Sequence, residues 1–151
     1  MESLNLPTYS FNIKFQGQRK YIFDTLRKKY VILTPEEWVR QNFLKFLTEN
    51  KNYPASLIFV EMEFKLNTLS KRCDAVVFNR SGNPVLIVEC KASTVKIDKL
   101  VFEQIARYNM QLKVDYLIVT NGLLHYCCKI DFENQNFEFL NDIPNFLQLL
   151  K

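Results

Sequence analysis

A short run of bulky apolar residues near the middle of the chain constrains the fold most. Val85-Leu86-Ile87-Val88 is apolar on both faces of an extended strand, as is typical of a central strand covered on both sides. A second buried-strand run is Tyr116-Leu117-Ile118-Val119. Between the two runs, residues 97–111 place apolar side chains on one helical face. The sequence therefore predicts a sheet with helices packed on it.

Local signals predict the other elements. Thr34 is a good N-cap and Pro35 suits the first helical position, so we expect a helix from there to about residue 50. Alternation around Gly17 predicts a hairpin, and Asn121-Gly122 predicts a two-residue type I′ turn into a strand over 123–129. Further strands are expected at 57–64, 73–78, 85–89 and 137–140, and a last helix at 143–150.

These elements predict a single α/β or α+β domain over residues 1–151, with a mixed central β-sheet flanked by helices. Residues 1–33 form an N-terminal hairpin extension in this prediction. The first residues resemble no signal peptide, and no apolar run is long enough to cross a membrane. We therefore expect a cytoplasmic protein without a membrane partner.

Composition excludes several kinds of site. With only three glycines, the chain cannot contain a P-loop or a G-x-G-x-x-G dinucleotide motif. One histidine, His125, rules out the two-histidine zinc motifs. The four cysteines follow no C-x-x-C spacing, so we expect reduced core thiols. A thiol-redox or zinc site is kept as an alternative only for the adjacent Cys127 and Cys128, which should face opposite sides of a strand.

Three charged residues on two neighbouring expected strands are the candidate site. Glu89 and Lys91 are two residues apart and share a face, and Asp74 opens the adjacent strand. Two carboxylates suit Mg²⁺, which takes few protein oxygens and keeps several waters. We expect Asp74 and Glu89 to converge with the Lys91 ammonium in one cleft. The alternative is a solvent-exposed ion pair, which fits poorly with the buried run directly before Glu89.

A set of ordered motifs adds to this interpretation. They are Arg27-Lys28-Lys29-Tyr30-Val31, Leu33-Thr34-Pro35-Glu36-Glu37-Trp38-Val39-Arg40-Gln41, Arg72-Cys73-Asp74, Val88-Glu89-Cys90-Lys91, Gln104-Ile105-Ala106-Arg107-Tyr108-Asn109 and Thr120-Asn121-Gly122. Together they resemble the type I restriction enzyme R-protein N-terminal domain family, within the PD-(D/E)XK nuclease superfamily.

This resemblance implies a restriction-endonuclease-like core in which Asp74, Glu89 and Lys91 match the catalytic triad, with Asp74 and Glu89 as ligands of Mg²⁺ or Mn²⁺. Gln104 matches a glutamine on the helix after the triad. Glu36 is our choice over Glu37 for a further acidic residue on the first helix, although both also suit a helix N-terminus. The implied activity is metal-dependent endonucleolytic hydrolysis of DNA.

The basic residues near these motifs are expected to contact phosphates, in a chain whose net charge is +4. They are Arg27, Lys28, Arg40, Arg72 and Arg107. Full-length R subunits carry an ATP-driven translocase, for which 151 residues leave neither the length nor a P-loop. We therefore expect a stand-alone nuclease, a component recruited by other restriction or defence proteins, or a non-cleaving nucleic-acid-binding or protein-interaction module. The oligomeric state stays open.

Overall fold

The computed structural model describes residues 1–66 and 69–150. Its strands are β1 (Ile13–Gln16), β2 (Arg19–Asp24), β3 (Lys29–Ile32), β4 (Ile58–Leu66), β5 (Leu69–Phe78), β6 (Pro84–Cys90), β7 (Tyr116–Thr120), β8 (His125–Asp131) and β9 (Asn136–Leu140). Its helices are α1 (Pro35–Asn50), the 3₁₀ turn η1 (Ala55–Leu57), α2 (Lys99–Met110) and α3 (Phe146–Leu149).

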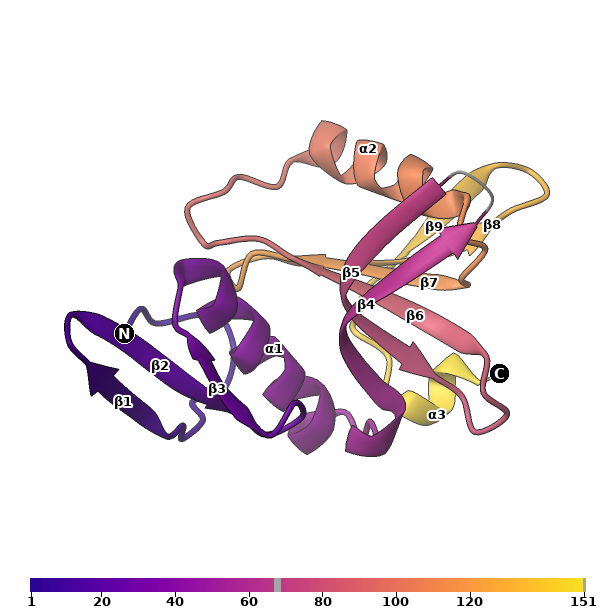
Figure 1. Cartoon of the computed structure of the whole chain (residues 1–151). Coiled ribbons are helices and arrows are strands. Elements are labelled where there is room, and N and C mark those ends of the chain that lie inside the picture. The colour runs from indigo at the N-terminus through magenta and orange to yellow at the C-terminus, as the bar shows by residue number, and fades with distance from the viewer. Residues whose placement is uncertain (67–68, 151) are drawn as a thin grey trace.

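The larger sheet has six strands in the order β4-β5-β6-β7-β8-β9. Strands β6 and β7 pair in parallel, and all the other neighbours pair antiparallel. Helix α2 makes the crossover between the two parallel strands (Figure 1). This mixed sheet with helices confirms the α+β class expected from the sequence.

Helices cover both faces of this sheet, as Figure 1 shows. On one face, Phe43 of α1 and Phe146 of α3 join a core with Val88 of β6. On the other face, Phe102 of α2 packs with Ile87 of β6 and the neighbouring strands. The run at residues 85–88 is fully buried, as a central strand with two covered faces requires.

Capping fixes where the helices begin. The Thr34 hydroxyl accepts a hydrogen bond from the Glu37 backbone N–H at 3.0 Å, and Pro35 is the first residue of α1, as expected. In the same way the Asp98 carboxylate accepts from the Val101 N–H and starts α2. The last helix is shorter than expected, since α3 has one turn over Phe146–Leu149.

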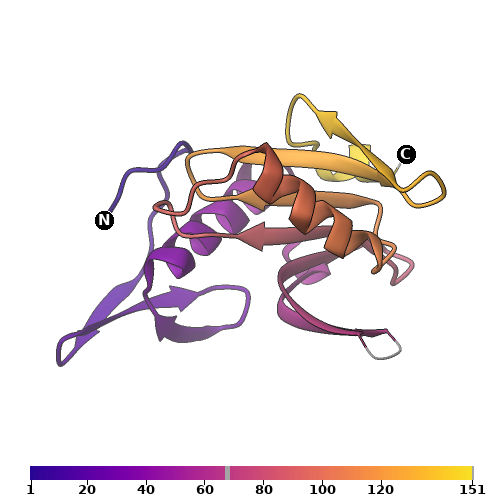
Figure 2. The ribbon, with the colours of Figure 1, turned by 90° about the horizontal axis from the view of Figure 1, so that it is seen from above.

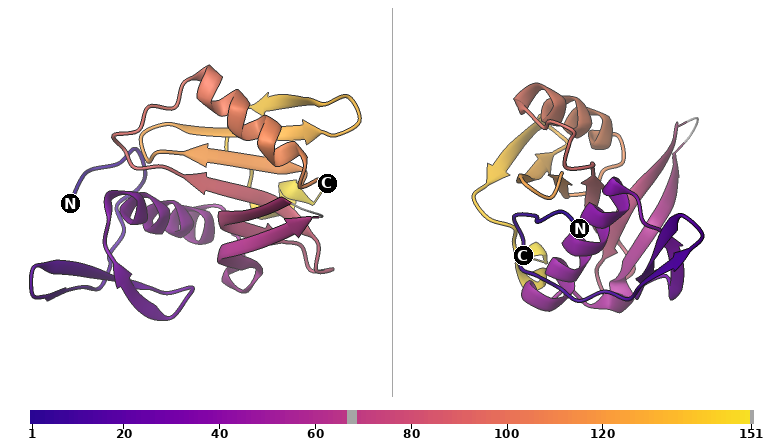
Figure 3. Two further views of the ribbon diagram at one scale, coloured as in Figure 1. Left: turned by 45° about the horizontal axis from the view of Figure 1, so that its top comes forward. Right: turned by 90° about the vertical axis from the view of Figure 1, so that its left-hand side faces the viewer.

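The N-terminal extension is a three-stranded sheet rather than a two-stranded hairpin. Strand β3 pairs with β2 in addition to the β1–β2 hairpin, so the extension is completed by residues that lead into α1. Figures 2 and 3 show this small sheet beside the first turns of α1, apart from the six-stranded sheet. A third strand pairs the outer edge of β2 that a hairpin would leave open.

The expected two-residue turn at Asn121-Gly122 is wrong. The connection between β7 and β8 has four residues, because the Asn121 side-chain oxygen accepts hydrogen bonds from the N–H groups of Leu123 and Leu124. Gly122 takes a φ of +85°, and Leu4 and Val39 lie against it. No helix in the described part of the chain is both long and apolar enough to pass through a membrane.

Candidate functional site

Asp74 and Glu89 lie on adjacent strands at one end of the β5–β6 ladder. Ala75 pairs with Val88, so Asp74 and Glu89 are the next residues on the two strands. Beyond that pair, the Cys90 N–H donates to the Asp74 Oδ2 at 2.7 Å instead of to the opposite backbone. At this point the Asp74 carboxylate takes the place of a backbone carbonyl as the hydrogen-bond acceptor.

The Asp74 carboxylate is turned toward α1. Its Oδ1 accepts a hydrogen bond from the Arg40 guanidinium at 3.3 Å. Burial raises the pKa of Asp74 to about 6; the Cys90 N–H and Arg40 oppose this shift, while the charges of Glu36 and Glu89 add to it. Asp74 is thus a partly buried carboxylate whose negative charge is incompletely balanced.

The Glu89 carboxylate is turned toward α2 and is 6% exposed. It forms an ion pair with the Lys71 ammonium and accepts a 3.4 Å hydrogen bond from the Asn109 side-chain amide. The Lys71 ammonium also lies 4.7 Å from the centre of the Tyr108 ring. The Asn109 Oδ1 atom is buried without a hydrogen-bond partner among the described residues.

Glu89, Lys91 and Gln104 come together in one shallow hollow of about 430 Å³ beside α2. Lys71 and Tyr108 also line it, and the Lys91 N–H donates to the Thr120 carbonyl, which fixes the end of β6 against β7. Asp74 does not line this hollow. Our expectation that Asp74 and Glu89 converge with Lys91 in one cleft is therefore wrong for Asp74, which faces Arg40 of α1, whereas Glu89, Lys91 and Gln104 share the hollow beside α2.

The two acidic residues at the start of α1 have different surroundings. Glu36 is exposed and lines an open groove of about 800 Å³ between the small sheet, strand β4 and the loop after β6. Its charge acts on Asp74, so it is near the candidate site. Glu37 is 6% exposed and bound by arginines. Of the two, Glu36 is the one open to solvent.

Arg27 and Arg40, which we expected to contact phosphates, belong instead to an internal ionic network. Arg27 pairs with Asp24, Glu37 and Glu61. Arg40 pairs with Glu37, Glu61 and Asp74. Both guanidinium groups are largely buried, and a group held by several carboxylates inside the protein is poorly placed to neutralise a bound phosphate. Arg27 and Arg40 are therefore unsuited to contact DNA.

The other three expected basic contacts are exposed. Arg72 lines the hollow that contains Glu89, Arg107 lies on the outer side of α2, and Lys28 lies in the turn between β2 and β3. Their positions allow contact with an external anion. Trp38, by contrast, donates its indole N–H to the Glu2 carbonyl and packs on Phe11, so it is a structural residue.

Asp74 and Glu89 carry the oxygen ligands that a hard divalent cation takes, although they face different helices and would have to turn toward each other to share one cation. Asp74 and Glu89 come from adjacent positions, and the incompletely balanced charge of Asp74 is what a bound cation would offset. Within residues 1–66 and 69–150, no three histidine, cysteine, aspartate or glutamate side chains are grouped as in a larger metal cage. Mg²⁺ needs only one or two carboxylates together with water.

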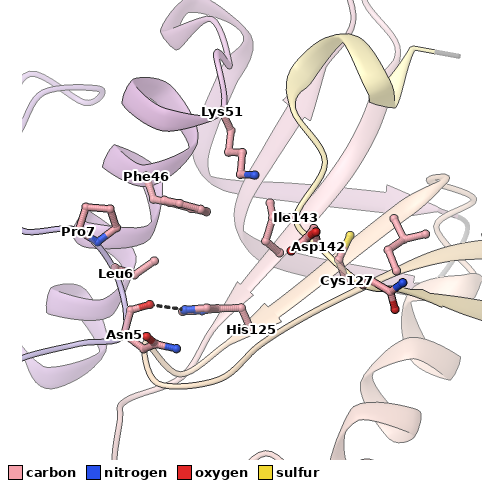
Figure 4. Close-up of a pocket in the computed structure, with 11 residues that line it drawn as sticks. Asn5, Leu6, Pro7, Phe46, Lys51, His125, Cys127, Asp142 and Ile143 are labelled. Atoms are coloured by element: carbon pink, nitrogen blue, oxygen red, sulfur yellow. Dashed lines mark hydrogen bonds between the residues drawn. The ribbon is translucent and has the colours of Figure 1, made fainter.

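The alternative site at His125 and the cysteine pair has no support in the structure. Cys127 packs on the α1 side of β8 and Cys128 on the α2 side, as adjacent strand residues must. His125 donates from Nε2 to the Asn5 carbonyl at 2.9 Å (Figure 4). Its Nδ1 accepts from the Thr120 hydroxyl. With both ring nitrogens engaged, the imidazole has no lone pair free for a metal.

Sequence reasoning missed the role of Asn109. This residue occupies a core position of α2, in register with Phe102 and Ala106 on the inner helix face. A polar side chain at such a position is a detectable signal, because it needs a buried partner, which here is Glu89. The pairing of Lys71 with Glu89 was also missed, because it joins residues on different strands.

Comparisons with known proteins identify the family and the fold of the chain. The family described as "Type I restriction enzyme R protein N terminus" matches residues 35–144 of the chain. Among solved structures, the chain resembles a fragment described as the HsdR subunit of a type I restriction enzyme from Vibrio vulnificus YJ016. The TM-score is 0.53 at 18% identity, and the match covers 78% of this chain and 25% of that one. No match was found among curated proteins.

The chain thus spans about a quarter of the subunit fragment that it resembles, and at this identity the likeness concerns the fold. The family match is broader, since it begins at the first residue of α1 and ends just before α3. It includes Asp74, Glu89, Lys91 and Gln104, and it leaves the small N-terminal sheet outside. The chain belongs to the family of the type I restriction enzyme R protein N terminus.

Proposed function

We propose that this domain hydrolyses phosphodiester bonds of DNA with the help of Mg²⁺. The observation that carries the proposal is the pairing position of Asp74 and Glu89 at the end of the β5–β6 ladder, with Lys91 and Gln104 in the same hollow as Glu89. This combines two oxygen ligands, one ammonium and one amide at one strand end. Family membership supports a nuclease context for these residues.

In this proposal the Asp74 and Glu89 carboxylates would turn from Arg40 and Lys71 toward each other to hold the cation, which would supply Lewis-acid polarisation of a phosphoryl oxygen and a bound water of lowered pKa. Lys91 has three donors and no acceptor, so it serves the anionic side of the reaction by stabilising charge on the phosphate. Gln104 is exposed at the rim of the hollow, where its amide can orient Lys91 or the substrate. Mn²⁺ is a plausible substitute for Mg²⁺ because it also accepts carboxylate and water ligands.

Lys71 and Asn109 have a positioning role in the same proposal. The Lys71 ammonium balances the buried Glu89 carboxylate, and Asn109 fixes one of its oxygens from α2. A buried carboxylate needs such partners to offset the cost of its desolvation. The pair therefore holds Glu89 in one orientation. DNA and other restriction subunits are the partners that this function implies.

A second candidate is a domain that binds nucleic acid or protein without cleaving. The observation in its favour is that each carboxylate already has a cation from the protein, Arg40 on Asp74 and Lys71 on Glu89. In such a domain the Arg40–Asp74 pair would hold α1 on the sheet, and the Lys71–Glu89 pair would join β5 to β6. The two candidates differ in whether the pair of carboxylates binds a divalent cation.

The deciding experiment combines calorimetric Mg²⁺ and Mn²⁺ titration with cleavage of supercoiled and linear DNA. Lys91→Ala should abolish cleavage and leave metal binding largely intact, whereas Asp74→Ala should weaken metal binding itself. Lys113→Ala, an exposed change away from the hollow, is the matched control and should behave like the wild type. A wild-type protein that binds neither metal and cuts neither DNA form would establish the non-cleaving candidate.

A further inference from the structure

The small N-terminal sheet carries the positive charge of the whole chain. Residues 13–32 contain six of the 20 basic residues and one of the 16 acidic residues, a net charge of +5. The rest of the chain has 14 basic and 15 acidic residues, a net charge of −1. The basic character of the protein therefore comes from this one structural unit, which we call the basic sheet and define as β1, β2, β3 and their turns.

Most of this charge is available to a partner. The single acidic residue, Asp24, is buried and is neutralised by Arg27. The remaining basic side chains of the basic sheet are exposed, namely Lys14, Arg19, Lys20, Lys28 and Lys29. No ion pair is formed by these five within the part of the chain that the structure describes. Such a concentration of exposed positive charge favours the binding of an anionic partner.

The strand register places basic and aromatic side chains on one face. Lys14 is paired with Tyr21, and Phe23 with Tyr30, so these four residues share a face. The Lys14 ammonium lies 4.1 Å from the centre of the Tyr30 ring, which is 39% exposed. The opposite face contains the buried Ile22.

This face borders the open groove that leads to the candidate site. Tyr21 and Tyr30 line the groove on one side. Ala92, the residue after Lys91, and Glu36 line it elsewhere. A chain of phosphates that lay along the groove would thus run from the exposed ammonium groups of the basic sheet to the end of β6.

The basic sheet is fixed in this position. Arg27, in its second turn, bonds Glu37 of α1 at 3.1 Å and Glu61 of β4 at 3.2 Å. These two ion pairs connect the extension to both walls of the groove. A surface held in place before binding loses little conformational freedom when a ligand is bound.

We propose that the basic sheet is the DNA-docking surface of this protein, and that it holds the backbone of duplex DNA in the groove beside the candidate site. The inference extends the proposed function by naming the element that binds the substrate, and it lies outside the region matched by the family. Duplex DNA fits because it supplies regularly spaced negative charges along an open groove. Binding by this surface is dominated by contacts with phosphates, which do not depend on the base sequence.

The test compares two variants with the same net charge. In the first, Lys14, Arg19, Lys20 and Lys29 of the basic sheet are all changed to Gln. In the second, the exposed residues Lys65, Arg80, Lys113 and Lys129 are changed to Gln. Each set lowers the net charge from +4 to 0, so the two variants differ only in where the charge is lost. Circular dichroism and thermal unfolding verify that both fold.

Binding of a short labelled duplex is measured by fluorescence anisotropy in EDTA, between about 50 and 200 mM salt. The basic-sheet variant should bind roughly tenfold or more weakly, and its log–log salt slope should fall by up to about 0.9 for each lost phosphate contact. The control variant should keep most of the affinity. Equal losses in the two variants, or unchanged binding by the first, would overturn the proposal.

Two further measurements separate this inference from the proposed function. Because binding is measured without metal, a wild type that binds through the basic sheet but never cleaves would refute only the nuclease proposal. A protein that cleaves with Mg²⁺ while the basic-sheet variant binds like the wild type would refute only the docking surface. Polyglutamate serves as a competitor: displacement of DNA at an equal concentration of charges would overturn duplex DNA in favour of an acidic polypeptide partner.

Discussion

Of the three carboxylates that share the Arg40 guanidinium, Glu37 and Asp74 have pKa values shifted in opposite directions. Burial alone would raise the pKa of Glu37, but hydrogen bonds from Arg40 and Gln41 and the charges of two arginines lower it. Burial also raises the pKa of Asp74, and there one backbone N–H and one 3.3 Å contact with Arg40 do not outweigh it. Arg40 thus offsets the cost of burial for the Glu37 carboxylate, together with its other partners, but not for the Asp74 carboxylate.

The difference separates a structural ionic network from a candidate site. Glu37 receives hydrogen bonds from three side chains, those of Arg27, Arg40 and Gln41, and its charge is balanced by the fold. Asp74 has other acidic groups near it, Glu36 and Glu89, which make its ionised form less stable. A carboxylate in that state gains more from an added cation than one that is already satisfied.

The largest expected effect comes from removing the shared cation. Arg40→Met leaves Glu37, Glu61 and Asp74 without one of their partners and should lower the free energy of unfolding by about 3–5 kcal/mol. Urea denaturation at pH 7 measures this loss. Lys45→Met on the same helix is the matched control and should change stability by about 0.5 kcal/mol or less. A loss below about 1 kcal/mol for the arginine variant would mean that the network contributes little.

A smaller effect, of opposite sign, is expected from Asp74→Asn. The folded-state pKa of Asp74 is about 6, above its ordinary value of 3.8. Between these values the folded state binds more protons than the unfolded state, so stability falls as pH rises through this window. Asn cannot ionise, and the variant should exceed the wild type by up to about 3 kcal/mol at pH 7. The advantage should disappear below about pH 4. Urea unfolding in EDTA from pH 4 to 7.5 measures it.

Glu37→Gln is the matched control for this pH dependence. The folded-state pKa of Glu37 is lowered, so its contribution to stability is present above the unfolded-state pKa and is lost as pH falls through the folded-state pKa. The variant should therefore be less stable than the wild type at pH 7, and the gap should narrow in acid. Parallel curves for the Asp74 and Glu37 variants would contradict the distinction between the two carboxylates.

The fold was largely predictable because its signals are local. The buried run at 85–88, the Thr34 cap and the periodicity of α2 each depend on neighbours within a few residues. The turn at Asn121 was not predictable in this way, since the Asn121 side chain replaced backbone bonds and lengthened the loop. Strand β3 was missed because its pairing with β2 is needed to recognise it.

The candidate site was less predictable, because ion-pair partners are set by tertiary structure. Glu37 and Arg40 lie three residues apart on a helix, and their pairing could have been inferred. The contact between Arg40 and Asp74 joins α1 to β5, and that between Lys71 and Glu89 joins two strands. Sequence spacing identified the charged residues near the strand ends and could not tell which of them face one another.

The smallest expected effect is stabilisation by Mg²⁺, which tests whether the unbalanced charge of Asp74 is used. A cation held by the Asp74 and Glu89 side chains would stabilise the folded state by about 1.4 kcal/mol at ten times its dissociation constant. Because Mg²⁺ competes with the proton on Asp74, the gain should be larger at pH 7 than at pH 5, on either side of the Asp74 pKa of about 6. Thermal unfolding with MgCl₂, against NaCl of equal ionic strength, measures it.

Asp74→Asn should lose the gain, whereas Glu37→Gln should keep it, since Glu37 lies in the network that the fold already satisfies. An equal gain in all three proteins would place the cation elsewhere on the surface and leave the Asp74 charge without a ligand.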